Sequence, residues 1–211
     1  MEKYVPHKIF RYLNLLVHRQ DAGNFILKKI GKLGSFYILD KEKKKARFNE
    51  IVNNCRTPLF GYYVLKNAKS IGEGFWCGGW STVNKNTILK EHVSMNGLRT
   101  EGDGNVTIGR YFHSGTECLI ITRSHNYEGE KIPYDNKHIY KDIEIGDFVW
   151  LGSRVMILPG TKIGEGAIIQ GGSVVHGEIP PYAIAGGNPA KVFKYRDKEH
   201  FEKLKAEEMF Y

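Results

Sequence analysis

Aliphatic residues recur at every sixth position in the second half of the chain. This aliphatic column consists of Ile145, Leu151, Ile157, Ile163, Ile169 and Val175. Four positions after each of them comes a small or β-branched residue, at Val149, Val155, Thr161, Ala167, Ser173 and Ile179. A period of six is neither that of a helix nor that of a simple strand. It predicts a short strand that ends in a tight corner, with three such sides closing one triangular coil.

A coil of this kind cannot bury its own interior, so coils must stack to form a core. We expect each aliphatic residue to lie on its counterpart from the next coil, with the small residue beside it. Glycine follows the aliphatic residue directly at Gly146, Gly152 and Gly164. We interpret these glycines as corner residues whose backbone angles a side chain would forbid. The fold class predicted is therefore all-β, a parallel solenoid.

The same period continues upstream less regularly, through Ile71, Cys77, Val83 and Leu89. It slips by one residue near 99–104 and resumes at Ile108, Ser114 and Ile120. A longer polar break, residues 123–142, is predicted to be an inserted loop. Insertions in solenoids project from one face, which is often the binding face.

The ends of the chain follow other rules. Residues 1–70 lack the repeat, and we predict a partly helical region there, with helices near residues 9–17 and 47–52, that contributes to acceptor specificity. Residues 71–195 form the predicted solenoid. Residues 196–211 are predicted to form a short C-terminal helix over Lys198–Met209 that caps it.

Composition narrows the classes of function. The formal net charge is +8, but no basic run is interleaved with aromatic residues as in single-strand binding platforms, so nucleic acid is not expected. Three cysteines without metal-type spacing suit a reducing compartment and no metal. No signal peptide and no apolar run near the ~20 residues of a membrane span are visible. We expect a cytoplasmic protein.

Several segments resemble the hexapeptide-repeat acyltransferases, above all the maltose, galactoside and nodulation-factor type and polysaccharide O-acetyltransferases. The resemblance covers about residues 93–195; it is carried by the segments 145–152, 157–160, 163–175, 180–184 and 187–192. It implies a left-handed parallel β-helix, although parallel crossovers are normally right-handed. It also implies a homotrimer that binds acetyl-CoA between subunits and acetylates a hydroxyl of a sugar or glycan precursor.

Acyl transfer from a thioester needs a base that takes the proton of the acceptor, and histidine is the usual one. Of eight histidines, His125 opens the inserted loop after the strand 119–122. The segment Arg123-Ser124-His125-Asn126 occupies the place of the family's catalytic base. The resemblance thus implies that His125 is the general base for direct attack on the thioester, with His113 as the next candidate. The family's usual Pro-Leu-like step is replaced by Asn126-Tyr127-Glu128, which leaves the acceptor in doubt.

The resemblance also suggests ligand contacts. Asn96, His113 and Asn126 are candidates for acceptor binding, although a turn asparagine without a function is an equal alternative for Asn96. Candidates for cofactor binding are Trp150, Ser153, Gly171, Gly172, Lys191 and Arg196. Trp150 would border the groove, the next three would offer backbone contacts to pantetheine, and the cations would meet phosphates. An aromatic cap and plain basic surface are the corresponding alternatives.

Other functions stay open at this point. The same donor would serve an N-acetyltransferase acting on an amino sugar nucleotide, or an O-acetyltransferase acting on a xenobiotic. A zinc-dependent carbonic anhydrase of the same solenoid type needs two histidines five residues apart, and no pair here has that spacing. A structural β-helix scaffold is the alternative that is not an enzyme. The sequence leaves open the identity of the acceptor and whether the acyl group is acetyl or longer.

Overall fold

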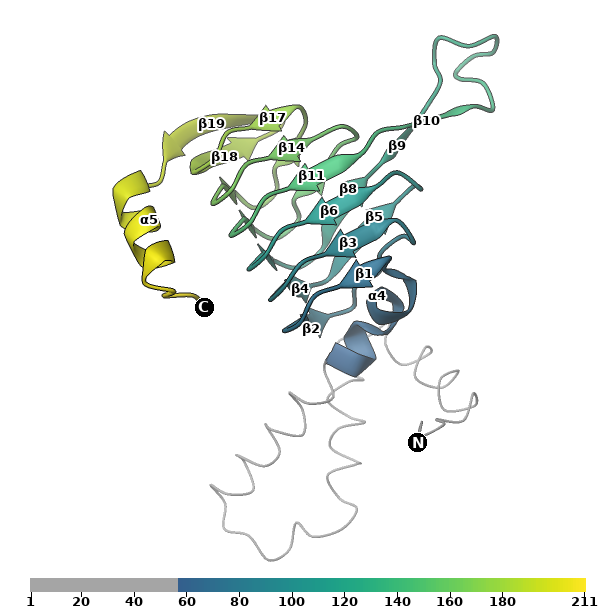
Figure 1. The fold of residues 1–211 in the computed structure, drawn as a ribbon. Coiled ribbons are helices and arrows are strands. Elements are labelled where there is room, and N and C mark those ends of the chain that lie inside the picture. The colour runs from purple at the N-terminus through teal and green to yellow at the C-terminus, as the bar shows by residue number, and fades with distance from the viewer. Residues whose placement is uncertain (1–56) are drawn as a thin grey trace, which may run out of the picture. The chain divides into compact units, whose positions relative to one another are not determined.

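The computed structural model describes residues 57–211, and within them the chain winds into stacked coils (Figure 1). Residues 57–60 are helical, and the helix α4 (Tyr62–Asn67) precedes the first coil. The helices predicted near residues 9–17 and 47–52 lie outside the described residues.

Three parallel sheets form the sides of the coils. The first sheet contains β1 (Ser70–Ile71), β3 (Thr87–Leu89), β6 (Val106–Ile108), β11 (Ile143–Ile145), β14 (Lys162–Ile163) and β17 (Glu178–Ile179). The second contains β2 (Trp76–Gly79), β4 (Ser94–Asn96), β7 (His113–Ser114), β12 (Trp150–Leu151), β15 (Ile168–Ile169) and β18 (Ala183–Gly187). The third contains β5 (Leu98–Glu101), β8 (Cys118–Ile121), β13 (Met156–Ile157) and β16 (Val174–Val175). The predicted parallel solenoid is confirmed.

Stacking of like residues builds the core. Ile145 pairs with Ile163, Leu151 with Ile169 and Ile157 with Val175, so each aliphatic residue meets the one 18 positions later. All six have at most 3% of their surface exposed, and the second column is buried as well. The polar members of that column form hydrogen bonds with the carbonyl three residues earlier. The hydroxyl of Thr161 donates to the carbonyl of Leu158, and that of Ser173 donates to the carbonyl of Gln170.

The corner glycines act differently from the expectation. Gly146, Gly152 and Gly164 do not have positive φ; a Cβ on Gly164 would lie 2.4 Å from the backbone nitrogen of Pro181 in the next coil. These glycines therefore permit close approach between coils. The left-handed position comes two residues later, where φ is 58° at Phe148, 61° at Arg154 and 83°, 69° and 75° at the glycines 160, 166 and 172. The predicted reason for the glycines was wrong.

The predicted slip of the period is confirmed. Ile71 pairs with Leu89, 18 residues later, whereas Leu89 pairs with Ile108, 19 residues later. Thr82 pairs with Arg99, only 17 residues later, so the side before β5 is one residue short, and the bend at residues 102–105 after β5 holds two additional residues.

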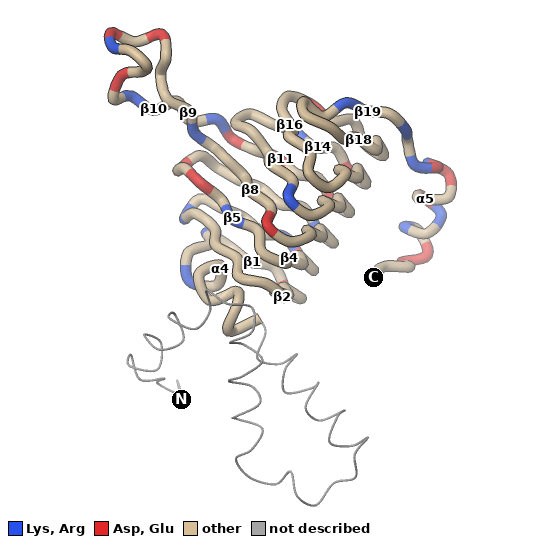
Figure 2. The backbone as a smooth tube through the Cα atoms, turned by 180° about the vertical axis from the view of Figure 1, so that it is seen from behind, with Lys and Arg blue, Asp and Glu red and all other residues tan. Residues whose placement is uncertain are grey.

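The polar break at residues 123–142 forms an arm that projects from the coils (Figure 1). Its base is a two-stranded antiparallel ribbon of β9 (Arg123–His125) and β10 (His138–Tyr140). The backbone N–H of Lys141 donates to the carbonyl of Thr122, which closes the arm where it leaves and rejoins the solenoid. The arm carries both acidic and basic residues (Figure 2).

The C-terminal segment first adds β19 (Ala190–Tyr195), antiparallel to β18, and then α5 (Lys198–Ala206). The helix is three residues shorter than expected and does not cap the last coil. It lies along one corner of the stack, as both Figure 1 and Figure 2 show. Phe201 contacts the rings of Tyr182 and Phe148, and Phe210 contacts Tyr111, so the aromatic residues of successive coils hold the segment in place.

Candidate active site

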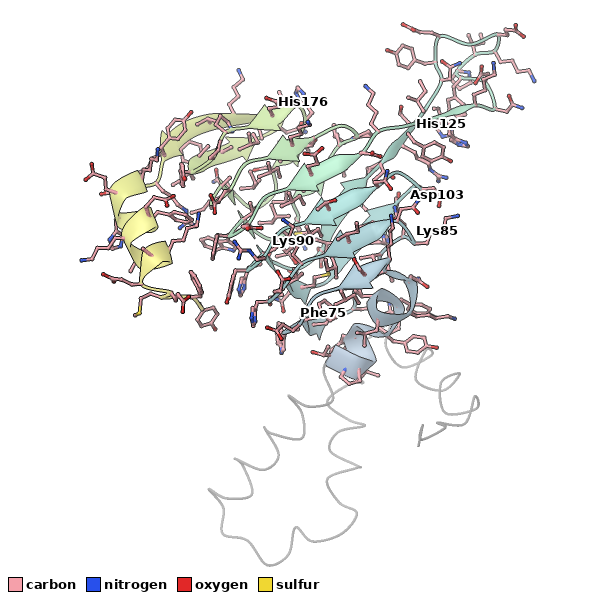
Figure 3. The ribbon with its side chains drawn as sticks, viewed as in Figure 1. Phe75, Lys85, Lys90, Asp103, His125 and His176 are labelled. Carbon is pink, nitrogen blue, oxygen red and sulfur yellow. The ribbon has the colours of Figure 1, made fainter. Side chains whose placement is uncertain are left out.

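His125 stands at the end of β9, where the arm leaves the coils (Figure 3). Its side chain is exposed. The imidazole stacks on the ring of Tyr134, with ring centroids 3.8 Å apart and planes 17° from parallel. On the neighbouring strand His138 faces it, with centroids 4.9 Å apart. The candidate base is thus accessible to a ligand and in contact with two rings.

A hydrogen-bonded turn closes the arm beyond His125. The side-chain amide of Asn126 donates to Asp135, 2.9 Å away, and the other carboxylate oxygen of Asp135 accepts from the backbone N–H of Lys137 at 2.8 Å. Asp135 is buried, with 8% of its surface exposed. The amide nitrogen of Asn126 is therefore engaged within the arm, which leaves its carbonyl oxygen for the predicted acceptor contact.

Asn96 and His113 lie side by side on the second sheet. The amide nitrogen of Asn96 donates to the carbonyl of Ser114, 3.1 Å away. His113 lies between Ser94 and Trp150 in register. Burial lowers the pKa of the His113 imidazole, against the opposing effect of a hydrogen bond with the backbone of Tyr211. The structure does not bring this pair to His125, which belongs to the arm beyond the third sheet.

A pocket of about 400 Å³ lies beside His113, between the second sheet and the C-terminal segment. Trp150 and Arg196 line it together with aromatic residues of the tail. The Nε atom of Arg196 is buried and has no hydrogen-bond partner among residues 57–211, and its guanidinium lies 5.4 Å from the ring centre of Phe201. Burial lowers the pKa of Arg196. Two of the predicted cofactor residues are therefore neighbours here.

The other predicted cofactor residues gather at the corner between the second and third sheets. Gly172 N–H donates to the carbonyl of Ser153 at 2.8 Å, and the hydroxyl of Ser153 accepts from the backbone N–H of Thr116 at 3.2 Å. Within residues 57–211, the backbone N–H groups of Ser153 and Gly171 have no protein acceptor. A Cβ on Gly172 would meet nothing within 4 Å. We name residues Ser153, Gly171 and Gly172 the glycine corner.

The two predicted phosphate-binding cations lie at opposite ends of β19. Lys191 is exposed and pairs with Gly186. The next residue, Gly187, donates its backbone N–H to Ser173, which places this end of β19 beside the glycine corner. Arg196 lies at the far end, where its backbone N–H donates to Tyr182. The structure thus brings Lys191, but not Arg196, to the glycine corner.

Comparison with known proteins adds independent information. Residues 142–177 match the family model described as bacterial transferase hexapeptide (six repeats). A putative lipopolysaccharide biosynthesis O-acetyl transferase, WbbJ of Escherichia coli K12, is 29% identical over 165 residues, which are 69% of this chain and 82% of the relative. The chain therefore carries the hexapeptide repeat of these bacterial transferases and is similar to named acetyltransferases.

Two further proteins show which part of the likeness lies in the sequence and which in the fold. A chloramphenicol acetyltransferase of Klebsiella aerogenes is 56% identical to this acyltransferase, but over only 52 residues, a quarter of each chain. A hexapeptide-repeat acetyltransferase of Vibrio cholerae shares the fold, with a TM-score of 0.55 and 21% identity over 87% of this chain and 92% of the other. The strong identity is thus local, whereas the fold is shared almost throughout.

The described part of the acyltransferase bears on three features: metal ligands, membrane-spanning helices and cysteines. Residues 57–211 contain no group of three potential metal-ligating side chains, and no helix among them is long and apolar enough to cross a membrane. Cys77 and Cys118 are buried, and burial raises the pKa of both thiols. These two cysteines are therefore held as thiols, which suits a structural role.

Sequence reasoning missed Tyr134 and His138 as neighbours of His125. The pairing of the two strands of the arm decides which residues face His125, and no period runs through residues 123–142 from which to predict it. One signal in the sequence could have indicated them. Three residues with rings, Tyr134, His138 and Tyr140, lie in the second half of the inserted loop, before the six-residue period resumes.

Proposed function

We propose that this acyltransferase transfers the acetyl group of acetyl-CoA to a hydroxyl of a sugar or glycan precursor, with His125 as general base. The observation that carries the proposal is the exposed imidazole of His125 at the foot of a braced arm. The likeness to WbbJ supports the acceptor class, because it extends over 82% of a protein named as a lipopolysaccharide biosynthesis O-acetyl transferase. The same proposal places the protein in the cytoplasm, where coenzyme A thioesters are used.

The reaction needs two proton transfers, one from the acceptor hydroxyl and one to the leaving thiolate. A neutral ring nitrogen of His125 takes the hydroxyl proton as the oxygen attacks the thioester carbonyl. The tetrahedral intermediate carries a negative oxygen, which backbone N–H groups stabilise. Its collapse breaks the carbon–sulfur bond, and the leaving thiolate takes up the proton that His125 had accepted, which gives free coenzyme A, the acetyl ester and a neutral His125.

The glycine corner fits the acyl donor. Pantetheine carries amide groups that accept hydrogen bonds, and the free N–H groups of Ser153 and Gly171 supply donors at an exposed edge. The missing side chain at Gly172 leaves room for the arm of the cofactor. Lys191 would bind a phosphate of the nucleotide portion. Acetyl-CoA supplies the activated acyl group, and these residues hold it.

One chain does not complete such a site by itself. The glycine corner precedes the third sheet along the coil, and the arm with His125 follows it. A closed cyclic trimer would solve this, because the arm of one subunit then faces the glycine corner of the next. We therefore propose a homotrimer whose active sites are shared between subunits.

The test is release of free thiol from acetyl-CoA across a panel of sugars, nucleotide sugars and antibiotics. With the best acceptor, His125→Ala should lower kcat by roughly 10²–10⁴-fold and leave KM for acetyl-CoA unchanged. His200→Ala, at an exposed histidine of α5, is the matched control and should keep the parent rate. If His125→Ala keeps the full rate and His113→Ala loses it, His113 is the base and this assignment is wrong.

A second acceptor class has one observation in its favour. Over 52 residues the chain is more similar to a chloramphenicol acetyltransferase, at 56% identity, than to WbbJ over its longer match. That similarity lies in a short segment, so it speaks for a common donor rather than a common acceptor. Acetylation of chloramphenicol in the panel, with no activity on any sugar, would replace the sugar proposal.

A further inference from the structure

His125 lacks the usual support of a catalytic histidine. A general base is normally oriented by a hydrogen bond from its second ring nitrogen to a carboxylate or carbonyl. In the part of the chain that the structure describes, the His125 side chain makes no hydrogen bond or ion pair, although it is exposed and attached to a projecting arm. Something else must limit its rotation if it is to act as a base.

Ring contacts take that place. Tyr134 lies flat against the imidazole at 3.8 Å, and His138 approaches it at 4.9 Å with planes 46° apart. His138 in turn contacts Tyr140, with centroids 6.2 Å apart. The result is a row of four rings, Tyr134, His125, His138 and Tyr140, across the base of the arm. Such ring contacts favour one rotamer of an exposed side chain.

The position of Tyr134 is itself fixed. The next residue, Asp135, is buried and accepts hydrogen bonds from Asn126 and Lys137, on both sides of the turn. A backbone hydrogen bond from Asp135 N–H to the carbonyl of Asn126 at 3.1 Å adds a third connection. Asn126 directly follows His125, so the brace ties the stacking ring to the backbone that carries the base.

We propose that Tyr134 and His138 are positioning residues that hold the imidazole of His125 in its reactive orientation by stacking instead of by a hydrogen bond. The inference rests on the proposed role of His125 and adds to it the means by which that side chain is oriented. Because stacking uses the ring faces, both ring nitrogens stay available at the edge, one of them for the hydroxyl of the acceptor.

Kinetics of matched variants test the proposal. Tyr134→Leu should lower kcat roughly 10- to 100-fold, because displacement of a catalytic group by about 1 Å has effects of this size. KM for acetyl-CoA should not change. Tyr134→Phe keeps the stacked ring and should keep kcat. Tyr127→Leu, at a tyrosine of the same arm that is 73% exposed, is the control and should behave as the parent.

The same logic applies to His138. His138→Ala removes the second ring and should lower kcat, whereas His138→Phe restores a ring without titratable nitrogens and should restore the rate. A loss in His138→Phe equal to that in His138→Ala would mean that His138 acts through its nitrogens, and would overturn the stacking role.

A spectroscopic measurement makes the test independent of activity. In ¹³C-labelled protein, the ring protons of His125, assigned by their loss in His125→Ala, should lie upfield because Tyr134 shields them. They should move downfield in Tyr134→Leu and stay in Tyr134→Phe. If these shifts do not change and Tyr134→Leu keeps its kcat while His125→Ala is inactive, the positioning role fails and the base assignment stands. If His125→Ala is active, the base assignment fails instead.

Discussion

The backbone N–H of Gly172 donates a hydrogen bond of 2.8 Å to the carbonyl of Ser153, one coil earlier in the stack. This contact makes the glycine corner a rigid edge with an empty position at Gly172. Gly172 has φ of 75°, which asparagine tolerates better than other side chains. We expect Gly172→Asn to fold normally and to raise KM for acetyl-CoA about tenfold, a loss of about 1.4 kcal/mol of binding.

Gly177→Asn is the control for that change. Gly177 has φ of 72° and equally open surroundings, but it lies after β16, at another corner. It should reproduce any cost of backbone strain without the change in KM. Thermal unfolding and steady-state kinetics measured on both variants separate the two effects. Equal KM values in both variants would remove the glycine corner from the cofactor site.

Lys191→Glu tests whether the cation beside the glycine corner meets a phosphate. Because like charges then face each other, KM for acetyl-CoA should rise, with little change in kcat at saturation. The dependence of KM on salt should weaken, since screening acts on the lost attraction. The measurement is KM at low and high ionic strength. Lys203→Glu, on the exposed side of α5, makes the same charge change and should have no effect; an effect of equal size there would leave Lys191 as ordinary surface.

Ile163 tests the stacked core, because its side chain is 3% exposed and pairs with both Ile145 and Ile179. Ile163→Ala should lower the free energy of unfolding by about 2–5 kcal/mol. Ile163→Asp, which buries an unpaired charge, should prevent folding. Lys162→Ala on the same strand should change stability by less than about 0.5 kcal/mol. Urea unfolding followed by circular dichroism measures all three, and a tolerated aspartate would contradict the assigned core.

The interior of the solenoid was predictable from the sequence because stacking forces one residue of each side inward at a fixed spacing. That is why the sequence alone places Ile145 and Ile163 in one column. The corners were harder. Left-handed φ falls on Phe148 and Arg154 as well as on glycines, so residue type alone does not mark it.

The arm and the C-terminal segment could not be predicted in the same way. His125 lies opposite His138 because β9 and β10 pair in this register, and no sequence repeat constrains the pairing of these two short strands. The place of α5 depends on aromatic contacts such as Phe201 with Tyr182, between residues whose proximity only the coil geometry reveals. Both elements lie outside the period, and both line the candidate sites.

Asp147 links stability to pH. Burial alone would raise the pKa of its carboxyl group, but hydrogen bonds from the backbone and side chain of Arg110, with the charge of Lys90, hold the pKa below its ordinary value. A lowered folded-state pKa contributes stability above the unfolded pKa of about 3.9, and this contribution is lost as pH falls towards the folded value.

Asp147→Asn should therefore lower the free energy of unfolding at pH 7 by about 1–3 kcal/mol. It should also reduce the loss of stability between pH 5 and pH 3, because the titrating group is gone. Urea unfolding at several pH values measures both effects. Asp103→Asn, at an exposed carboxylate, should leave the profile unchanged. A parallel downward shift of the Asp147→Asn curve at every pH would contradict the linkage.

The shared site predicts that two inactive proteins can restore each other. His125→Ala lacks the base but keeps the glycine corner; a double variant Gly172→Asn with Lys191→Glu keeps the base but binds acetyl-CoA poorly. Co-expression with two affinity tags yields mixed trimers, and native mass spectrometry should give about three times the chain mass of 24.1 kDa.

In random mixtures about a quarter of the interfaces combine an intact base with an intact corner. Activity at subsaturating acetyl-CoA should then clearly exceed that of either parent. The matched control mixes His125→Ala with His125→Ala/Gly172→Asn, in which no interface carries a base, and it should stay inactive. A monomeric mass, or mixed trimers that recover nothing, would mean that each chain holds its own complete site.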